Sequence, residues 1–163
     1  MEALRRQILE IVERDGRADP GQIGRMLGVP RETVEEVLRQ AEESGLVVGY
    51  KAVVHWEKAG EDLILALIEV KVSPQRDVGF DALAQRIARF PETRSVYLVS
   101  GAYDLAVMIE GHTMKEVAHF VSHKLATIEH VLSTATHFVL KTYKHHGTIV
   151  EDGEEDRRLV VTP

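Results

Sequence analysis

Residues 19–43 read DPGQIGRMLGVPRETVEEVLRQAEE, and this stretch predicts two short helices joined by a turn. Asp19 can accept hydrogen bonds from the first turn of a helix, and Gly28 suits the left-handed position that ends one. Pro30 fits the first turn of a second helix, where its missing N–H removes no hydrogen bond. The apolar residues of the two helices recur at helical spacing, at Ile23, Met26 and Leu27 and at Val34, Val37, Leu38 and Ala41.

The flanking segments extend this unit in both directions. Before it, a further helix is predicted by the apolar positions Leu4, Ile8, Ile11 and Val12. After it, residues 46–56 hold two short β-prone runs broken near Gly49 and Lys51, which predicts a hairpin or wing. Three short helices and a two-stranded wing describe a winged helix-turn-helix over residues 1–56, followed by a linker at residues 57–61.

From residue 62 the pattern changes to that of a mixed α and β domain. Strands are predicted at 63–72, 96–99, 105–109 and 137–143, and helices at 77–90 and 113–128. The order β-α-β-β-α-β is that of a ferredoxin-like sandwich, with both helices on one face of a four-stranded sheet. The fold class is therefore α+β, with a winged helix-turn-helix followed by a ferredoxin-like domain at residues 62–146.

The sheet of this second domain predicts self-association. Helices cover only one of its faces, and the other face carries apolar residues such as Leu65 and Leu67. Because an exposed apolar sheet face is a site of association, we expect a homo-oligomer, with a dimer as its unit.

Composition excludes several classes of protein. The chain has 163 residues, of which 44% are hydrophobic and 28% charged, as in ordinary globular domains. It has no cysteine, which excludes disulfides, thiolate metal sites and cysteine nucleophiles. We see no signal peptide and no apolar run long enough for a membrane span, so a cytoplasmic protein without membrane contact is expected. The net charge of −6 argues against a surface that is basic all over.

Three motifs in this order resemble the Lrp/AsnC family of transcription regulators, over residues 1 to about 146. Residues 44–50 (SGLVVGY) look like the family's passage from the recognition helix to the wing. Residues 100–104 (SGAYD) look like the Thr-Gly-x-Tyr-Asp loop of its sensor domain, and residues 134–140 (TATHFVL) are similar to the stretch that opens the last sensor strand. The resemblance implies DNA binding, dimers that assemble further, commonly into octamers, and a small effector that is usually an amino acid.

The resemblance places the effector near the 100–104 loop, at a contact between dimers. Carried over to this chain, the effector-binding positions are Gly101, Ala102, Tyr103, Asp104, Thr134 and Thr136. A glycine turn exposes backbone N–H groups to a carboxylate, and Asp104 can accept from an ammonium group. The alternative is that Gly101 only makes the turn and Asp104 caps it.

The candidate recognition helix differs from the family pattern. Family members typically have Ser at its start and an Arg pair in its middle, where this chain has Pro30 and Glu36-Val37. Residues 31–43 contain two arginines and five glutamates, which disfavours contact with phosphates. Arg31 can read guanine, and a glutamate can read the cytosine amino group. The candidate DNA-binding residues are Arg17, Arg25, Arg31, Thr33, Glu35, Arg39 and Lys51.

No residue pattern indicates an enzyme or a cofactor. His119 and His123 lie four residues apart beside Glu116, a spacing that can hold a metal, but a solvated helix face gives the same pattern and we expect no metal site. Siroheme decarboxylases share the two-domain build, but their His- and Arg-rich stretches are missing here. The leading hypothesis is a DNA-binding regulator with an amino-acid effector. The alternative is an oligomeric ligand sensor of the same fold whose DNA binding is weak or lost.

The C-terminal arm, residues 147–163, has two interpretations. Five acidic residues precede Leu159-Val160-Val161 in this segment. It is either a frayed terminus or an arm whose apolar end adds to a sheet edge.

Overall fold

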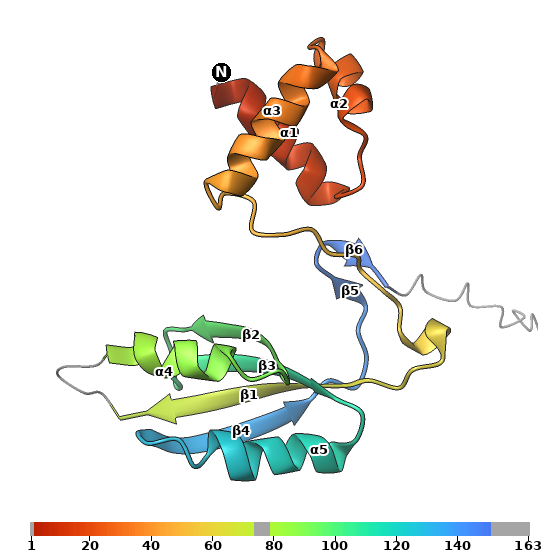
Figure 1. Cartoon of the computed structure of the whole chain (residues 1–163). Coiled ribbons are helices and arrows are strands. Elements are labelled where there is room, and N and C mark those ends of the chain that lie inside the picture. Colours follow the sequence, from red (N-terminus) through yellow and green to blue (C-terminus); the bar gives the residue numbers. More distant parts are fainter. Residues whose placement is uncertain (1, 74–78, 151–163) are drawn as a thin grey trace, which may run out of the picture. The chain divides into compact units, whose positions relative to one another are not determined.

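The computed structural model describes residues 2–73 and 79–150 and divides into two compact units (Figure 1). One unit comprises Met1–Val54 with Lys144–Pro163, and the other comprises His55–Tyr143. None of the described helices is both long and apolar enough to cross a membrane. The proposed apolar end of the arm, Leu159-Val160-Val161, lies outside the described residues.

The first unit is built on three helices, as expected. They are α1 (Glu2–Arg14), α2 (Pro20–Leu27) and α3 (Arg31–Glu43). Their core consists of the buried side chains Ile8, Val12, Ile23 and Val34. Met26 was expected on the apolar side of α2, but its side chain is 68% exposed. The Met26 side chain points to solvent while Ile23 and Leu27 of the same helix pack in the core, so that expectation is wrong.

The turn between α2 and α3 follows the residues that predicted it. Asp19 caps α2 by accepting a hydrogen bond from the Gln22 backbone N–H at 3.0 Å. Gly28 ends the helix with φ +70°, in the left-handed region. A Cβ atom on Gly24 would lie 2.6 Å from the carbonyl oxygen of Val29, so the turn can be this tight only with glycine at that position.

The hairpin predicted at residues 46–56 is wrong. Residues 46–55 contain no strand, and Val48 is 96% exposed. A β-prone run forms a strand only where a partner strand supplies hydrogen bonds. A hairpin forms later instead, where β5 (Lys144–His145) pairs with β6 (Thr148–Ile149). His146 and Gly147 connect the two strands with φ +45° and +79°, the signs of a type I′ turn.

The second unit has the expected ferredoxin-like topology. After a short 3₁₀ turn at Glu57–Ala59, its four strands form an antiparallel sheet in the order β2-β3-β1-β4. The strands are β1 (Ile64–Val72), β2 (Thr93–Leu98), β3 (Leu105–Gly111) and β4 (Val131–Phe138). The helices are α4 (Gly79–Ala88) and α5 (Met114–His119), and α5 continues as a π-helical turn at Phe120–Leu125. Asp77 and Val78, where the α4 helix was expected to begin, lie outside the described residues.

The last strand begins and ends earlier than predicted. It spans Val131–Phe138 rather than 137–143. Phe138 pairs with Ala66 near the start of β1, and the Val139 N–H bonds to the carbonyl of Leu65 at 2.8 Å. The strand ends here although Ile64 of β1 would stand opposite Leu140, and Leu140 is 96% exposed.

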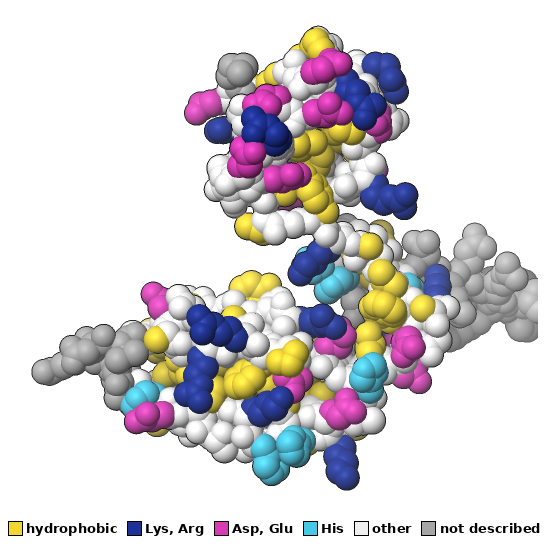
Figure 2. Space-filling view, viewed as in Figure 1, with side chains coloured by type: hydrophobic (Ala, Val, Ile, Leu, Met, Phe, Trp, Pro, Cys, Tyr) yellow, Lys and Arg dark blue, Asp and Glu magenta, His cyan; other side chains and the backbone are white. Residues whose placement is uncertain are grey.

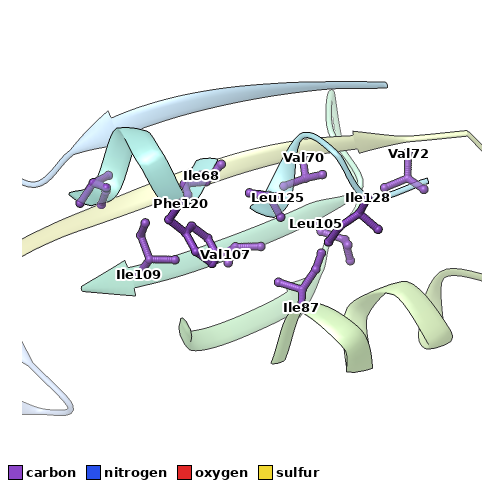
Figure 3. Close-up of a cluster of buried hydrophobic side chains, with 12 residues drawn as sticks. Ile68, Val70, Val72, Ile87, Leu105, Val107, Ile109, Phe120, Leu125 and Ile128 are labelled. Carbon is purple, nitrogen blue, oxygen red and sulfur yellow. The ribbon is translucent and has the colours of Figure 1, made fainter. Parts of the chain in front are cut away.

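One apolar core lies between the helices and a single face of the sheet (Figure 3). Alternate residues of β1 and β3 point into it, because successive side chains of a strand face opposite sides. These are Ala66, Ile68, Val70, Val72, Leu105, Val107 and Ile109. Ile87 from α4 and Phe120 and Leu125 from the π turn cover them, and the Phe90 and Phe120 rings meet edge to face at 5.5 Å.

No helix of residues 2–73 and 79–150 is packed on the opposite face of the sheet. By the same alternation, Leu65, Leu67 and Glu69 of β1 point to this open face, with Met108 of β3 beside Leu67. The Glu69 carboxylate lies 3.6 Å from Nε2 of His137 on β4. Glu110 of β3 stands beside Leu65 on the same face, so the open face mixes apolar and charged side chains along its length.

Candidate functional site

The exposed side of α3 is an alternation of opposite charges. Figure 2 shows Lys and Arg side chains next to Asp and Glu over the three-helix unit. Both arginines of α3 are about half exposed, and each contacts carboxylates of the same unit.

Arg31 lies at the start of α3 between two carboxylates. Its Nε donates to Glu35 Oε1 at 2.7 Å, and its Nη1 lies 3.5 Å from Asp19 Oδ2. The hydrogen bond that Arg31 donates to Glu35 and the charge of Asp19 raise the pKa of Arg31. Asp19 therefore has two roles, since its other oxygen caps α2. The sequence predicted only the cap, because the ion pair joins residues on different elements.

Arg39 is held more completely. Its Nε and Nη2 donate to the two oxygens of Glu36, at 3.0 and 2.5 Å, and its Nη1 donates to Glu43 at 2.6 Å. The hydrogen bonds from Arg39 and Gln40 lower the pKa of Glu36. All three nitrogens of the Arg39 guanidinium are thus engaged within the helix.

The remaining DNA-binding candidates lie apart from these ion pairs. Arg17 and Arg25 are exposed on the loop before α2 and on α2, and Thr33 is half-buried in the first turn of α3. Lys51 is exposed on the irregular segment after α3. In residues 2–73 and 79–150 no ion pair is recorded for Arg17, Arg25 or Lys51, so these cations are available to phosphates.

Tyr50 is a residue of this surface that the sequence did not single out. Its hydroxyl donates to Glu42 Oε1 at 2.9 Å, and its ring lies against Gly16. Burial and the Glu42 carboxylate raise the pKa of Tyr50. Tyr50 therefore fastens the segment that carries Lys51 to the ends of α1 and α3.

In the second unit, the 100–104 loop joins β2 to β3 at the end of β1. The Val99 N–H bonds to the Asp104 carbonyl at 2.9 Å, and the Asp104 N–H bonds to the Val70 carbonyl at 3.0 Å. Asp104 Oδ2 accepts from the Val72 N–H at 2.8 Å. Gly101 has φ +151° with open space around it. The Asp104 carboxylate thus holds the end of β1 rather than its own turn, and the Gly101 and Ala102 positions are exposed.

Thr134 and Thr136 lie on the other side of β1 from this loop. In the register of β4 they stand opposite Val70 and Ile68, so their side chains share the helix-covered face. Thr134 reaches the same end of the sheet as Asp104, with β1 between them, and Thr136 lies further along β4. The structure therefore gathers the predicted positions at one end of the sheet without bringing their side chains into contact.

A cavity of about 310 Å³ opens at that end of the sheet. Val72 lines it, together with Phe80 and Leu83 of α4. Its polar residues are Ser73, Arg86, Glu129 and His130. His130 has φ +75°, and its carbonyl accepts from the Ser73 N–H at 2.9 Å. The sequence missed this cavity because its walls come from three separate segments.

The histidines of α5 and its π turn form no three-ligand group. The His119 and His123 rings stack at 4.2 Å, and His123 Nδ1 lies 2.8 Å from Ser122 Oγ. Glu116 instead accepts from the His112 N–H at 2.8 Å. Among the described residues, no three His, Asp or Glu side chains are placed to hold a metal ion.

Comparison with known proteins covers both units. The family model for the Lrp/AsnC ligand binding domain matches residues 65–149, and that for a winged helix-turn-helix DNA-binding domain matches residues 1–48. The uncharacterised HTH-type transcriptional regulator YugG of Bacillus subtilis is 48% identical over 158 residues, which cover 96% of this chain and 95% of that protein. The HTH-type transcriptional regulator FL11 of Pyrococcus furiosus is 32% identical, with coverage of 85% and 89%.

Solved structures share the fold. A transcriptional regulator from Neisseria meningitidis, solved in complex with L-methionine, superposes with a TM-score of 0.72 at 24% identity, over 90% of this chain and 94% of that one. AsnC of Escherichia coli superposes with a TM-score of 0.69 at 21% identity, over 89% and 95%. The helix-turn-helix, the ferredoxin-like domain and these matches lead to one conclusion: the chain belongs to the Lrp/AsnC family of transcriptional regulators.

Proposed function

We propose that this regulator binds double-stranded DNA through α2 and α3, and that an amino-acid effector bound in its ligand-binding domain alters the assembly that presents those helices. Residues 1–56 are assigned to DNA binding and residues 62–146 to effector binding and self-association. Residues 57–61 serve as a linker, and residues 147–163 form a C-terminal arm. The family consists of transcriptional regulators and not of enzymes. A regulator that binds DNA in a bacterium or archaeon acts in the cytoplasm, and we assign this chain to that compartment.

The helix-turn-helix of residues 19–43 carries the DNA-binding half of the proposal. In this motif the N-terminal residues of the second helix contact base edges in the major groove. Arg31 begins that helix, and the exposed Arg25 and Arg17 flank it on α2 and on the loop before it. A dimer would present two such helices about 34 Å apart, to successive major grooves on one side of the duplex.

The end of the sheet near Asp104 supports the effector half. The exposed Gly101–Ala102 turn offers backbone N–H groups, and the adjacent cavity of about 310 Å³ is large enough for a small ligand. Arg86 at the cavity can pair with a carboxylate. The Neisseria relative with bound L-methionine indicates an amino acid as the class of ligand to test first.

The acidic α3 favours one alternative function. Its net charge of −3 and the internal ion pairs of Arg31 and Arg39 reduce the attraction to phosphates. A chain of this kind could serve as an oligomeric ligand sensor with weak DNA binding. Selection of genomic DNA fragments with the purified full chain separates the two: enrichment of defined sites supports the regulator, and recovery of random fragments supports the sensor.

Calorimetric titration tests the effector. We expect one or a few of the twenty amino acids to bind the full chain. If the ligand ammonium meets Asp104, Asp104→Asn should weaken binding about ten- to a hundred-fold. If the ligand carboxylate enters the cavity, Arg86→Met should weaken binding by a similar factor, and Asp104→Asn should not. Absence of binding by every amino acid would reject this class of effector, and normal affinity in both variants would reject this end of the sheet as the site.

A further inference from the structure

We infer that Arg31 reads a guanine in each operator half-site, and that Asp19 and Glu35 are positioning residues that hold its guanidinium for this purpose. The inference rests on the proposed DNA binding and deepens it, because it names the base that this chain recognises and the side chains that fix the reading group.

The first step is the direction in which the Arg31 side chain is held. Nε is bonded to Glu35 one turn further along α3, and Nη1 faces Asp19 at the cap of α2. The stem lies over Gly21, where a Cβ atom would be 3.7 Å from both Cδ and Nη1 of Arg31. Contacts from two helices thus limit the rotamers of a side chain that is 54% exposed. A reading group held by its neighbours loses less entropy when it binds.

The second step is the set of donors that remains. Glu35 accepts the hydrogen bond from Nε. The 3.5 Å between Nη1 and Asp19 Oδ2 is that of an ion pair and is longer than an ordinary hydrogen bond. Within the described residues, no hydrogen bond is recorded for Nη2. The Nη1–Nη2 edge therefore keeps two parallel N–H donors. Guanine offers the matching pair of acceptors, O6 and N7, in the major groove.

The third step is the local charge, which favours a base over a phosphate. Arg31 stands between two carboxylates, so the group of three carries a net charge of −1. A phosphate would be repelled by the negative charge of that group. The edge of guanine is uncharged, and it is recognised by the positions of its two hydrogen-bond acceptors. Arg31 is therefore better suited to recognising a base than to binding phosphates without sequence preference.

Arg39 provides the matched comparison on the same helix. Its Nε, Nη1 and Nη2 each donate to Glu36 or Glu43, whereas only Nε of Arg31 makes such a hydrogen bond, so Arg39 is held more strongly within its own helix. Loss of Arg39 should leave the base preferences unchanged. Loss of Arg31 should remove one of them.

The test is selection of binding sites from a random DNA library by the full chain, followed by affinity measurements at several salt concentrations. The wild type should enrich a site with a guanine at symmetric positions. Arg31→Ala should lower the preference for that guanine about 5- to 150-fold, and Arg39→Ala should not change it. Glu35→Ala should reduce the same preference, and Glu35→Gln, which keeps an acceptor for Nε, should restore most of it. Thermal unfolding of each variant shows that the helices remain folded.

Two outcomes overturn the inference separately from the proposed function. If the wild type enriches a site and Arg31→Ala keeps every base preference, Arg31 is not a reader, although DNA binding stands. If Arg31→Ala weakens binding equally on all sequences and lowers the salt slope by about 1, Arg31 contacts a phosphate. If the wild type enriches no sequence and binds no DNA at low salt, the proposed function fails, and this inference fails with it.

Discussion

Asp104 holds the end of β1 and is also the proposed partner of the effector's ammonium group. Its Oδ2 accepts the Val72 N–H at 2.8 Å, so Asp104→Ala would leave that N–H without its acceptor. We expect Asp104→Ala to lower the free energy of unfolding by about 1–3 kcal/mol. Asp104→Asn keeps an oxygen at the same place and should cost less than half as much. Urea denaturation of both variants checks this order, and equal losses would show that the charge, and not the acceptor, matters.

Lys124 and Glu92 make stability depend on pH. Burial alone would raise the pKa of Glu92, but the hydrogen bond and charge of Lys124 lower it below the usual value. The stabilisation is therefore fully present above the ordinary glutamate pKa and is lost as the pH falls through the lower pKa of the folded state.

Lys124→Met should remove this contribution. We expect a loss of about 1 kcal/mol at pH 7, because the pair is only partly screened by solvent. The difference from wild type should shrink as the pH falls below about 4. Lys115→Met, an exposed position on the same helix, is the control and should change little. Denaturant titrations from pH 7 to pH 3 measure both, and a difference that stays constant with pH would contradict the assignment.

At the scale of elements, the α2–α3 turn depends on Gly24. A Cβ atom there would lie 2.6 Å from the Val29 carbonyl, and that backbone is fixed by the Val29 N–H bond to the Gly24 carbonyl at 2.9 Å. Alanine gains about 1 kcal/mol of helix propensity, but the forced displacement costs more, so we expect Gly24→Ala to lose about 1–2 kcal/mol net. Gly49→Ala, with open space around it and no positive φ, is the matched control. A thermal melt in which both variants match wild type would contradict the close approach.

Helix α3 limits its own affinity for DNA. Glu36→Gln should leave Arg39 with one acceptor oxygen in place of two and remove one negative charge. We expect tighter non-specific binding and a salt slope steeper by about 1. Glu10→Gln, which releases Arg6 from a similar pair on α1, should have a smaller effect. Gel-shift titrations at several salt concentrations decide this, and weaker binding by Glu36→Gln would mean that this glutamate reads a base.

The elements show which features a sequence can predict. The cap at Asp19 and the end at Gly28 were predictable because each depends on residues within one turn of the helix. The limits of β4 were not, since they depend on its pairing with β1, which is distant in sequence. The predicted hairpin at residues 46–56 failed because β propensity does not supply a partner strand. The ion pair of Asp19 with Arg31 and the cavity near Val72 also join separate elements, and no local pattern signals such contacts.

At the scale of the whole molecule, the open sheet face should drive self-association. Leu65 and Leu67 face away from the helices in the central strand β1, where a partner sheet would cover them. We expect Leu67→Lys to lower the mass of the assembly in light scattering, because it places a charge in the middle of this face. Leu140→Lys, at a fully exposed position outside the sheet, should leave the mass unchanged. An unchanged assembly in Leu67→Lys would mean that the subunits meet elsewhere.

The π-helical turn at Phe120–Leu125 makes the chain tolerant of a change in length. Such a turn contains one more residue than an α-helical turn, and the surplus is taken up without disturbing the helix on either side. Ser122 lies on its exposed side, and its hydroxyl contacts carbonyls of the preceding turn and Nδ1 of the neighbouring His123. Deletion of Ser122 would convert the turn to an α-helical one while Phe120 and Leu125 stay in the core. We therefore expect a variant that lacks Ser122 to keep the fold of this domain.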